Sequence, residues 1–436
     1  MKTKIYLLAV LLFVAHFSVF SQEILSLDDA LKQALTNKYS IVIAKNEFEI
    51  SKNNNSIGNA GLLPKIDGNA GYNSTVFNTN QVFLDGRTLE RDNAATNVLN
   101  LGVMLNWTLF DGMAMFINKS RLEQLQEIGE NNYKIEIENS VQEISLAYFE
   151  LSRTKYLIDV LTKNLSYSQD RLNFNENRYL VGSGSKLDFL QAKVDYNADV
   201  SNLKRQQLYY ESLKIQFNQL LARDSDISFE VANEIKINAN LNYEELKKLT
   251  LSENNQLKLA NKSFALSANE LKLTNASRMP RLNANAGYNF SKTDAQAGFL
   301  LSNQVNGFLY GITATIPIFD GFNKNRNYQN AKLNMLISET QLKEISNNLN
   351  SVLNIAWRNY QTNLDLMKLE EQNVASAIEN VDISIEKYKI GTISNLQLKD
   401  AQENLLNAEN NLINVKFEIK KSEIDLLKLS GSLIKN

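Results

Sequence analysis

Two stretches of alternating apolar and polar residues, each expected to fold back on itself, set the strongest limit on what this chain can form. Residues 308–318 have the sequence FLYGITATIPI, with apolar residues at every second position. Residues 282–290 alternate in the same way. A period of two is typical of a strand with one apolar face. Each run is about as long as a membrane-spanning strand, roughly 9–11 residues, so residues 280–319 are predicted to form a β-hairpin of such strands.

The same hairpin occurs earlier, at residues 64–110. The FDG motif at 110–112 and the glycine turn at Gly182 both recur after 209 positions, whereas Pro64 recurs as Pro280 after 216. The second hairpin turn is therefore shorter, and the rest of the copy keeps its register. A duplicated unit of about two hundred residues is far longer than a solenoid repeat. We therefore expect two halves of one fold.

The duplication divides the chain into segments. We predict a signal peptide at 1–21, a first repeat at 22–222, a connector at 223–242 and a second repeat at 243–436. The first segment carries two lysines before a short apolar stretch, which is typical of a secretory signal and too short to span a bilayer. No later apolar run is long enough for a membrane-spanning helix. An exported chain of this kind enters a membrane as strands.

Long helices are predicted around both hairpins. Residues 113–179 contain no proline and a single glycine, and residues 323–388 repeat the pattern, so each is expected to be one continuous helix. A glycine turn and a return helix follow each of them. Shorter helices are expected before the hairpins, over 26–61 and 243–277.

The last helix has a regular apolar pattern. Its apolar or small residues are spaced three and four apart, which is typical of a coiled-coil seam. A similar seam begins on the preceding long helix, although a plain antiparallel hairpin core has the same pattern. The seam residues are Leu398, Ala401, Leu405, Ala408, Leu412, Val415, Ile419, Ser422, Leu426 and Leu429, and on the preceding helix Leu342, Ile345, Leu349, Val352 and Ala356.

Composition excludes several functions. The net charge is −2 and no basic cluster appears, which argues against nucleic acid binding. The chain has no cysteine, and its single histidine, His16, lies in the predicted signal peptide. Catalysis by His or Cys and a Cys/His zinc site are therefore excluded from the mature chain. No nucleophile–base set, phosphate loop or metal-ligand spacing appears, so we expect neither an enzyme nor a cofactor.

Four strands per chain cannot close a membrane barrel. Open strand edges in hydrocarbon leave backbone groups unpaired at a cost of several kcal/mol each. We therefore expect several copies to share one barrel, with the long helices continuing from the strand ends. The polar strand face would line the lumen, and residues 78–97 of the first hairpin are expected as polar loop. The predicted lumen residues are Asn69, Asn73, Asn283, Asn285 and Thr313.

These features together resemble the TolC-like outer-membrane efflux proteins over almost the whole chain after the signal peptide. The resemblance is carried by the following motifs: LSLDDALKQAL at 25–35, GLLPKIDGNAGYN at 61–73, its copy RMPRLNANAGYN at 278–289, the two FDG turns, and the paired turns Tyr179–Gly182 and Tyr388–Gly391. Each motif is weak alone. In this order, and duplicated, they are specific.

The resemblance implies a mainly α fold with membrane β-strands. It implies a homotrimer with a twelve-stranded barrel in outer-membrane lipid and a long α-helical barrel across the periplasm. A periplasmic adaptor and an inner-membrane pump of RND, ABC or MFS type are the implied partners, and substrates pass passively in efflux or type I secretion. The exported substrate is not specified. The alternative is a structural coiled-coil protein of the periplasm or cell surface, which has no need of lipid-facing alternation.

The resemblance also implies an entrance at the two tip turns, residues 178–188 and 387–397, with adaptor contacts near Gly182, Gly184 and Gly391. The implied gating residues are Asp188, Asp400, Tyr388, Tyr179, Gln397 and Gln191. Simpler roles remain open for them. Early acids are favoured by the helix dipole, the tyrosines can pack beneath a helix turn, and the glycines can serve only to end helices.

Overall fold

The computed structural model describes residues 24–434, so the predicted signal peptide lies outside the described residues. The chain forms two compact units. Unit 1 comprises the described residues up to Lys45, residues 133–257, and residues from Ile345 onward; unit 2 comprises residues 46–132 and 258–344. Each unit thus takes segments from both repeats. The division falls within the two long helices, so that both strand hairpins lie in unit 2 and both glycine turns lie in unit 1.

The helical hairpins of unit 1 form as the sequence predicts. Helices α4 (Ala114–Leu180) and α5 (Lys186–Leu220) come from the first repeat, and α8 (Asn323–Lys389) and α9 (Asn395–Leu429) come from the second. The two long helices lie within one residue of their expected bounds, because no proline interrupts them, and a return helix follows each glycine turn as expected. Among the helices of residues 24–434, none combines the length and apolar character that a membrane span requires.

The shorter helices differ from expectation. The predicted helix over 26–61 is divided into α2 (Leu27–Asn37) and α3 (Tyr39–Asn54), because Lys38 has an extended backbone. The predicted helix over 243–277 is likewise α6 (Tyr243–Glu253) and α7 (Asn255–Ala276). Such breaks lack a proline or glycine signal in the sequence.

Apolar packing between α8 and α9 forms much of the core of unit 1. The predicted α9 seam is confirmed, since eight of its ten members are buried and Val415 and Leu429 are partly buried. On α8 the prediction is partly wrong, because Val352 is 40% exposed whereas Leu353 and Tyr360 are fully buried. These two residues pack with Leu246 of α6 and Ile419 of α9. The predicted members Leu349 and Ala356 are buried, so Leu353 takes the inward position that was predicted for Val352.

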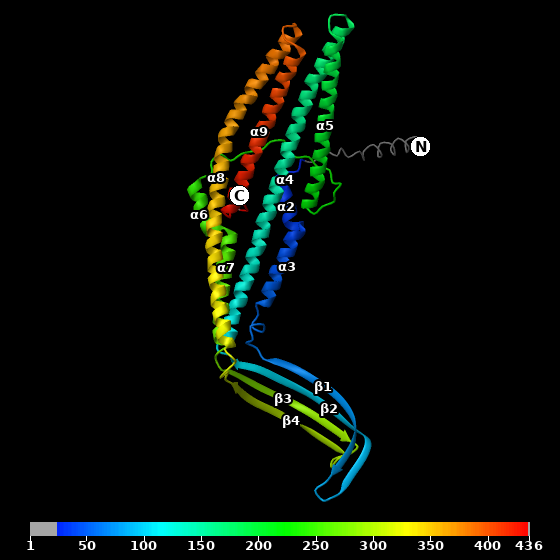
Figure 1. The fold of residues 1–436 in the computed structure, drawn as a ribbon, viewed down its shortest axis with the longest axis vertical. Helices are drawn as coiled ribbons and strands as arrows, with labels where there is room; N and C mark the ends of the chain where they lie inside the picture. The colour runs from blue at the N-terminus through cyan, green and yellow to red at the C-terminus, as the bar shows by residue number, and fades with distance from the viewer. Residues whose placement is uncertain (1–23, 435–436) are drawn as a thin grey trace, which may run out of the picture. The chain divides into compact units, whose positions relative to one another are not determined.

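Unit 2 is built on a four-stranded antiparallel sheet in the order β1-β2-β3-β4 (Figure 1). The strands are β1 (Lys65–Val82), β2 (Thr88–Phe110), β3 (Arg281–Ala295) and β4 (Ser302–Thr315). Both predicted hairpins are present, and β2 pairs with β3 to join them. The predicted polar loop over 78–97 is wrong. Most of that segment is strand, since β1 and β2 stay paired from Thr79–Arg91 to Val82–Thr88, because alternating polar residues also suit a two-stranded ribbon.

Candidate functional site

The turns between the paired helices of unit 1 follow from local chemistry. Gly182 and Gly391 have φ values of +75° and +78°, in the left-handed region that ends helices at low cost for glycine. Ser185 and Ser394 then begin the return helices by accepting hydrogen bonds from backbone N–H groups. A side chain at Gly184 would press against Arg178 at 2.8 Å, so only glycine fits there without movement.

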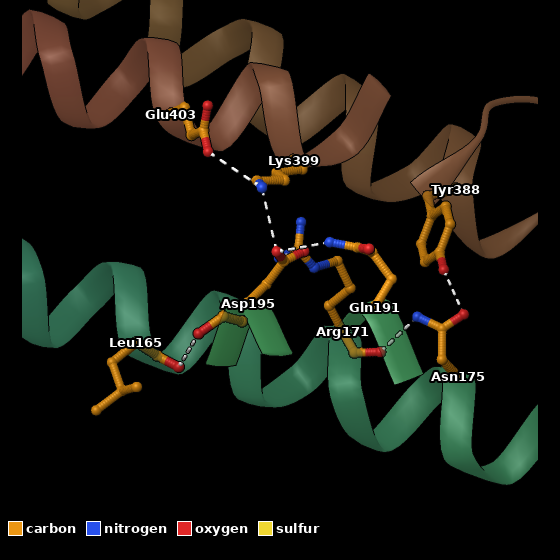
Figure 2. A network of polar contacts seen from close by, with 9 residues as sticks. Leu165, Arg171, Asn175, Gln191, Asp195, Tyr388, Lys399 and Glu403 are labelled. Atoms are coloured by element: carbon orange, nitrogen blue, oxygen red, sulfur yellow. Dashed lines mark hydrogen bonds and ion pairs between the residues drawn. The ribbon is translucent and has the colours of Figure 1, made fainter. Parts of the chain in front are cut away.

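A buried polar contact links α8 to α4 close to these turns. Tyr388 is 6% exposed, and its hydroxyl donates a hydrogen bond of 2.7 Å to Oδ1 of Asn175, which is itself buried (Figure 2). Asn175 in turn donates to the carbonyl of Arg171 at 2.8 Å. Burial raises the pKa of the Tyr388 hydroxyl, the Asn175 bond acts in the opposite direction, and the charge of nearby Asp188 raises it further. Tyr388 therefore stays a neutral donor at physiological pH.

A second contact joins three helices through one carboxylate. Asp195 of α5 accepts from Nη2 of Arg171 on α4 at 3.2 Å and from Nζ of Lys399 on α9 at 3.1 Å (Figure 2). The side chains of Arg171 and Asp195 are only 3% and 8% exposed. Lys399 also pairs with Glu403 at 3.5 Å. We call Arg171, Asn175, Asp195, Tyr388 and Lys399 the interhelical network, because it ties the α4–α5 hairpin to the α8–α9 hairpin.

A polar cavity of about 280 Å³ borders this network, lined by residues that include Arg171, Asp195, Asp199 and Lys399. Burial raises the pKa of the Asp199 carboxyl, whereas a hydrogen bond with Ser168 and the charge of Arg171 lower it. Within the described part of the chain, Nε and Nη1 of Arg171 have no hydrogen-bond partner. A cavity this polar and roomy admits water, which can satisfy such groups.

The predicted gating residues fall into two groups. Tyr388 belongs to the network, Asp188 lies near enough to act on its pKa, and Gln191 donates to Asp195 at 3.1 Å. The others lie outside it. Tyr179 is 38% exposed and stacks on Phe189, and Gln397 exchanges hydrogen bonds with Ser394 in a capping box at the start of its own helix. Asp400 is exposed on α9.

Sequence reasoning missed Arg171, Asn175, Asp195 and Lys399. They lie two to three helical turns away from the glycine turns, outside any recognisable motif. A signal was present in the duplication, because Asp199 stands 209 positions before Ala408 of the apolar seam. A charged residue at a seam position indicates a buried polar contact that replaces apolar packing.

The two faces of the sheet in unit 2 differ in chemistry. The register places Ile66, Leu105, Ala286 and Tyr310 in one row on the apolar face. The five residues predicted to line a lumen all lie on the opposite face: Asn69, Asn73, Asn283, Asn285 and Thr313. On that face the hydroxyl of Thr108 on β2 donates to Oδ1 of Asn283 on β3 at 3.0 Å, so polar side chains of neighbouring strands bond to each other.

Comparisons with known proteins agree with this architecture. A family model described as "Outer membrane efflux protein" matches residues 30–222 and 246–432. The outer membrane efflux protein BepC of Brucella suis is 20% identical over 411 residues, which cover 94% of this chain and 84% of that protein. The outer membrane protein TolC of Escherichia coli is 22% identical over 362 residues, which cover 78% of this chain and 70% of that protein.

Solved structures show the same fold. The Campylobacter jejuni CmeC outer membrane channel has a TM-score of 0.78 at 18% identity, covering 93% of this chain and 86% of that one. The Vibrio cholerae outer membrane protein VceC has a TM-score of 0.76 at 17% identity, covering 93% of this chain and 96% of that one. The likeness spans both units, including the sheet and the helical hairpins.

Proposed function

This chain belongs to the outer membrane efflux protein family, and from that membership we propose how its own residues build, close and dock the channel. It is an outer-membrane efflux channel that extends into the periplasm. Members of the family are channels rather than enzymes, and they act as trimers in tripartite efflux systems. This membership argues against the alternative of a structural coiled-coil protein.

The unpaired edges of the sheet support a membrane barrel that several subunits share. Within the sheet β1 and β4 each have one strand neighbour. In hydrocarbon an open edge costs several kcal/mol for each unpaired backbone group. Three copies remove every edge when β1 of one pairs with β4 of the next. The row of Ile66 and Tyr310 then faces lipid, and the row of Asn69 and Asn289 faces the water of the lumen.

The interhelical network is the proposed closure of the periplasmic entrance. Opening requires the α8–α9 hairpin to move away from the α4–α5 hairpin. That movement separates Lys399 and Tyr388 from Asp195 and Asn175. Because removing one partner of a buried ion pair leaves a charge uncompensated, the closed arrangement is favoured until another contact replaces it.

The tip turns are the proposed docking site for a periplasmic adaptor. Their apolar side chains are well exposed in the subunit: Leu180, Val181, Leu187, Ile390 and Leu396. Exposed apolar side chains concentrated at two turns are typical of a protein contact. The adaptor connects the channel to an inner-membrane pump of RND, ABC or MFS type, and the channel conducts passively.

Fractionation tests the barrel. We expect the chain in outer membranes as an oligomer that resists dissociation in cold SDS and migrates as a subunit after heating. Crosslinking should give a trimer. Recovery as a periplasmic monomer would contradict the proposed barrel.

A double variant tests the aspartates. If Asp188 and Asp400 converge near the trimer axis, they raise local negative potential and favour cations. We expect Asp188→Asn with Asp400→Asn to lower cation selectivity in planar-bilayer recordings. Unchanged selectivity would leave both residues with a role at the helix start only, favoured by the helix dipole.

A further inference from the structure

The loop between β3 and β4 exposes three successive apolar side chains. Phe299, Leu300 and Leu301 are 85%, 56% and 69% exposed. Water-exposed loops rarely carry contiguous apolar side chains without an interaction that uses them. The turn between β1 and β2 also exposes apolar side chains, Val82 and Leu84, but there Arg87 pairs with Asp85 at 2.7 Å.

Hydrogen bonds hold the β3–β4 loop against β2. The backbone N–H of Gln296 donates to the carbonyl of Ala95 at 2.9 Å, and its side-chain oxygen accepts from the N–H of Ala95 at 3.1 Å. Arg91 donates to the carbonyl of Gln296. The Gln296–Ala95 bonds continue the β2–β3 ladder by one residue pair beyond Thr96–Ala295, so they hold the base of the loop beside β2.

The loop also reaches β1, and this contact identifies the face that it covers. A Cβ atom at Gly298 would lie 3.9 Å from Oε1 of Gln81. The bulge between Phe77 and Thr79 adds its extra residue to β2, since their partners are Ala94 and Arg91. The alternation along β1 is thus unbroken, and Gln81 lies on the same face as Asn69 and Asn73. The loop lies over the polar face of the sheet.

We propose that Phe299, Leu300 and Leu301 form an apolar collar that narrows the extracellular mouth of the channel. The proposal rests on the proposed function, in which the polar face lines a trimeric barrel. In the trimer, three copies of the loop then meet around the barrel axis. The apolar side chains of each loop contact the loops of the other two subunits and not lipid. Apolar constrictions impede hydrated ions by dewetting. The collar therefore favours amphipathic organic substrates over inorganic ions.

The conductance of a serine variant tests the collar. The measurement uses the Asp195→Ala background, because a closed periplasmic entrance in series would mask any change at the mouth. In that background Phe299→Ser with Leu300→Ser and Leu301→Ser should raise potassium conductance in planar bilayers at least about twofold, because a polar ring stays wet. The control is Leu84→Ser in the same background, which changes a fully exposed apolar residue of the other loop and should leave conductance unchanged. Intact trimeric channels whose conductance equals that of Asp195→Ala alone would overturn the collar.

Crosslinking gives an independent test, since the chain contains no cysteine. Phe299→Cys should form disulfide-linked dimers between subunits on mild oxidation, whereas Leu84→Cys should not. If brominated lipid instead quenches a probe attached to Phe299→Cys, the loop faces the membrane and the collar is wrong. Failure of the unmodified protein to form trimers would refute the barrel itself, and the collar with it.

Discussion

The two helical hairpins descend from one duplicated sequence, yet the two helices within each hairpin are held together by different chemistry at equivalent positions. In the α8–α9 hairpin, Val374 packs against Ala408 and Leu412. In the α4–α5 hairpin, the position equivalent to Ala408 is Asp199, and the buried pair of Arg171 with Asp195 lies beside it. One copy keeps an apolar seam, and the other has exchanged part of it for charge.

This difference suggests separate roles for the two kinds of contact: apolar packing holds a hairpin together, and ion pairs control its movement. Apolar packing is non-directional and tolerates small displacements, so it holds α8 and α9 together as a unit. Buried ion pairs need precise geometry, and the folded state loses much free energy of stabilisation when one partner is removed. The network therefore favours the arrangement of the two hairpins in which its ion pairs are formed. We infer that the apolar hairpin moves as a body, whereas the charged contacts decide when it moves.

The largest effect is expected from removing the central carboxylate. Asp195→Ala leaves Arg171 buried without its counter-ion and frees Lys399, so the free energy of unfolding should fall by about 3–5 kcal/mol. Melting of the trimer in detergent measures this loss. Resting single-channel conductance should rise, because the tie between α5 and α9 is gone.

Its control is the equivalent position of the other repeat. Asn404 follows Asp195 by 209 positions and is exposed on α9, so Asn404→Ala should change stability by less than about 0.5 kcal/mol. Equal effects of the two variants would contradict the distinction between the hairpins.

A cavity in the apolar seam is expected to have the next largest effect on stability, without opening the channel. Leu412 is 7% exposed against Val374, and Leu412→Ala should cost about 2–5 kcal/mol. Resting conductance should stay at the wild-type value, because the interhelical network is intact. A conductance above that of Asp195→Ala would show that the seam, and not the ion pair, controls the entrance.

The two equivalent tyrosines sharpen the comparison. Tyr388→Phe leaves Oδ1 of Asn175 buried without its donor, which should cost about 1–3 kcal/mol. Tyr179→Phe keeps the stacking on Phe189 and should be nearly neutral. Melting temperatures of the paired variants measure the difference. Similar shifts for both would mean that the Tyr388 hydroxyl contributes little to closure.

The sequence predicts those elements that depend on periodic patterns. The strand alternation and the α9 seam follow from side-chain period, and the long helices follow from the absence of proline. The residues predicted to line a lumen share a face because strand geometry is fixed. The network was not predictable in detail, because Asp195 and Lys399 meet only after two hairpins pack. Alternation alone could not distinguish the far part of the β1–β2 ribbon, within residues 78–97, from a polar loop, because polar residues predominate in both.

The smallest expected effect concerns Asp199, which faces Ser168 and Arg171 of α4, Asp195 of its own helix and Lys399 of α9. Burial raises the pKa of its carboxyl above the ordinary value of 3.8, so the folded state binds this proton more tightly than the unfolded state. Above the folded pKa the ionised group costs stability, and that cost disappears as the pH falls through the folded pKa.

Asp199→Asn should therefore raise the melting temperature slightly at neutral pH, and the gain should shrink as the pH is lowered toward the ordinary range of a carboxyl. Melting curves of variant and wild type across that range measure the effect, with Asp400→Asn as the exposed control. A lower melting temperature of the variant at neutral pH would mean that attraction to Arg171 and Lys399 exceeds the cost of burial. The ion pairs would then stabilise the α4–α5 hairpin as well as control the movement of the other hairpin.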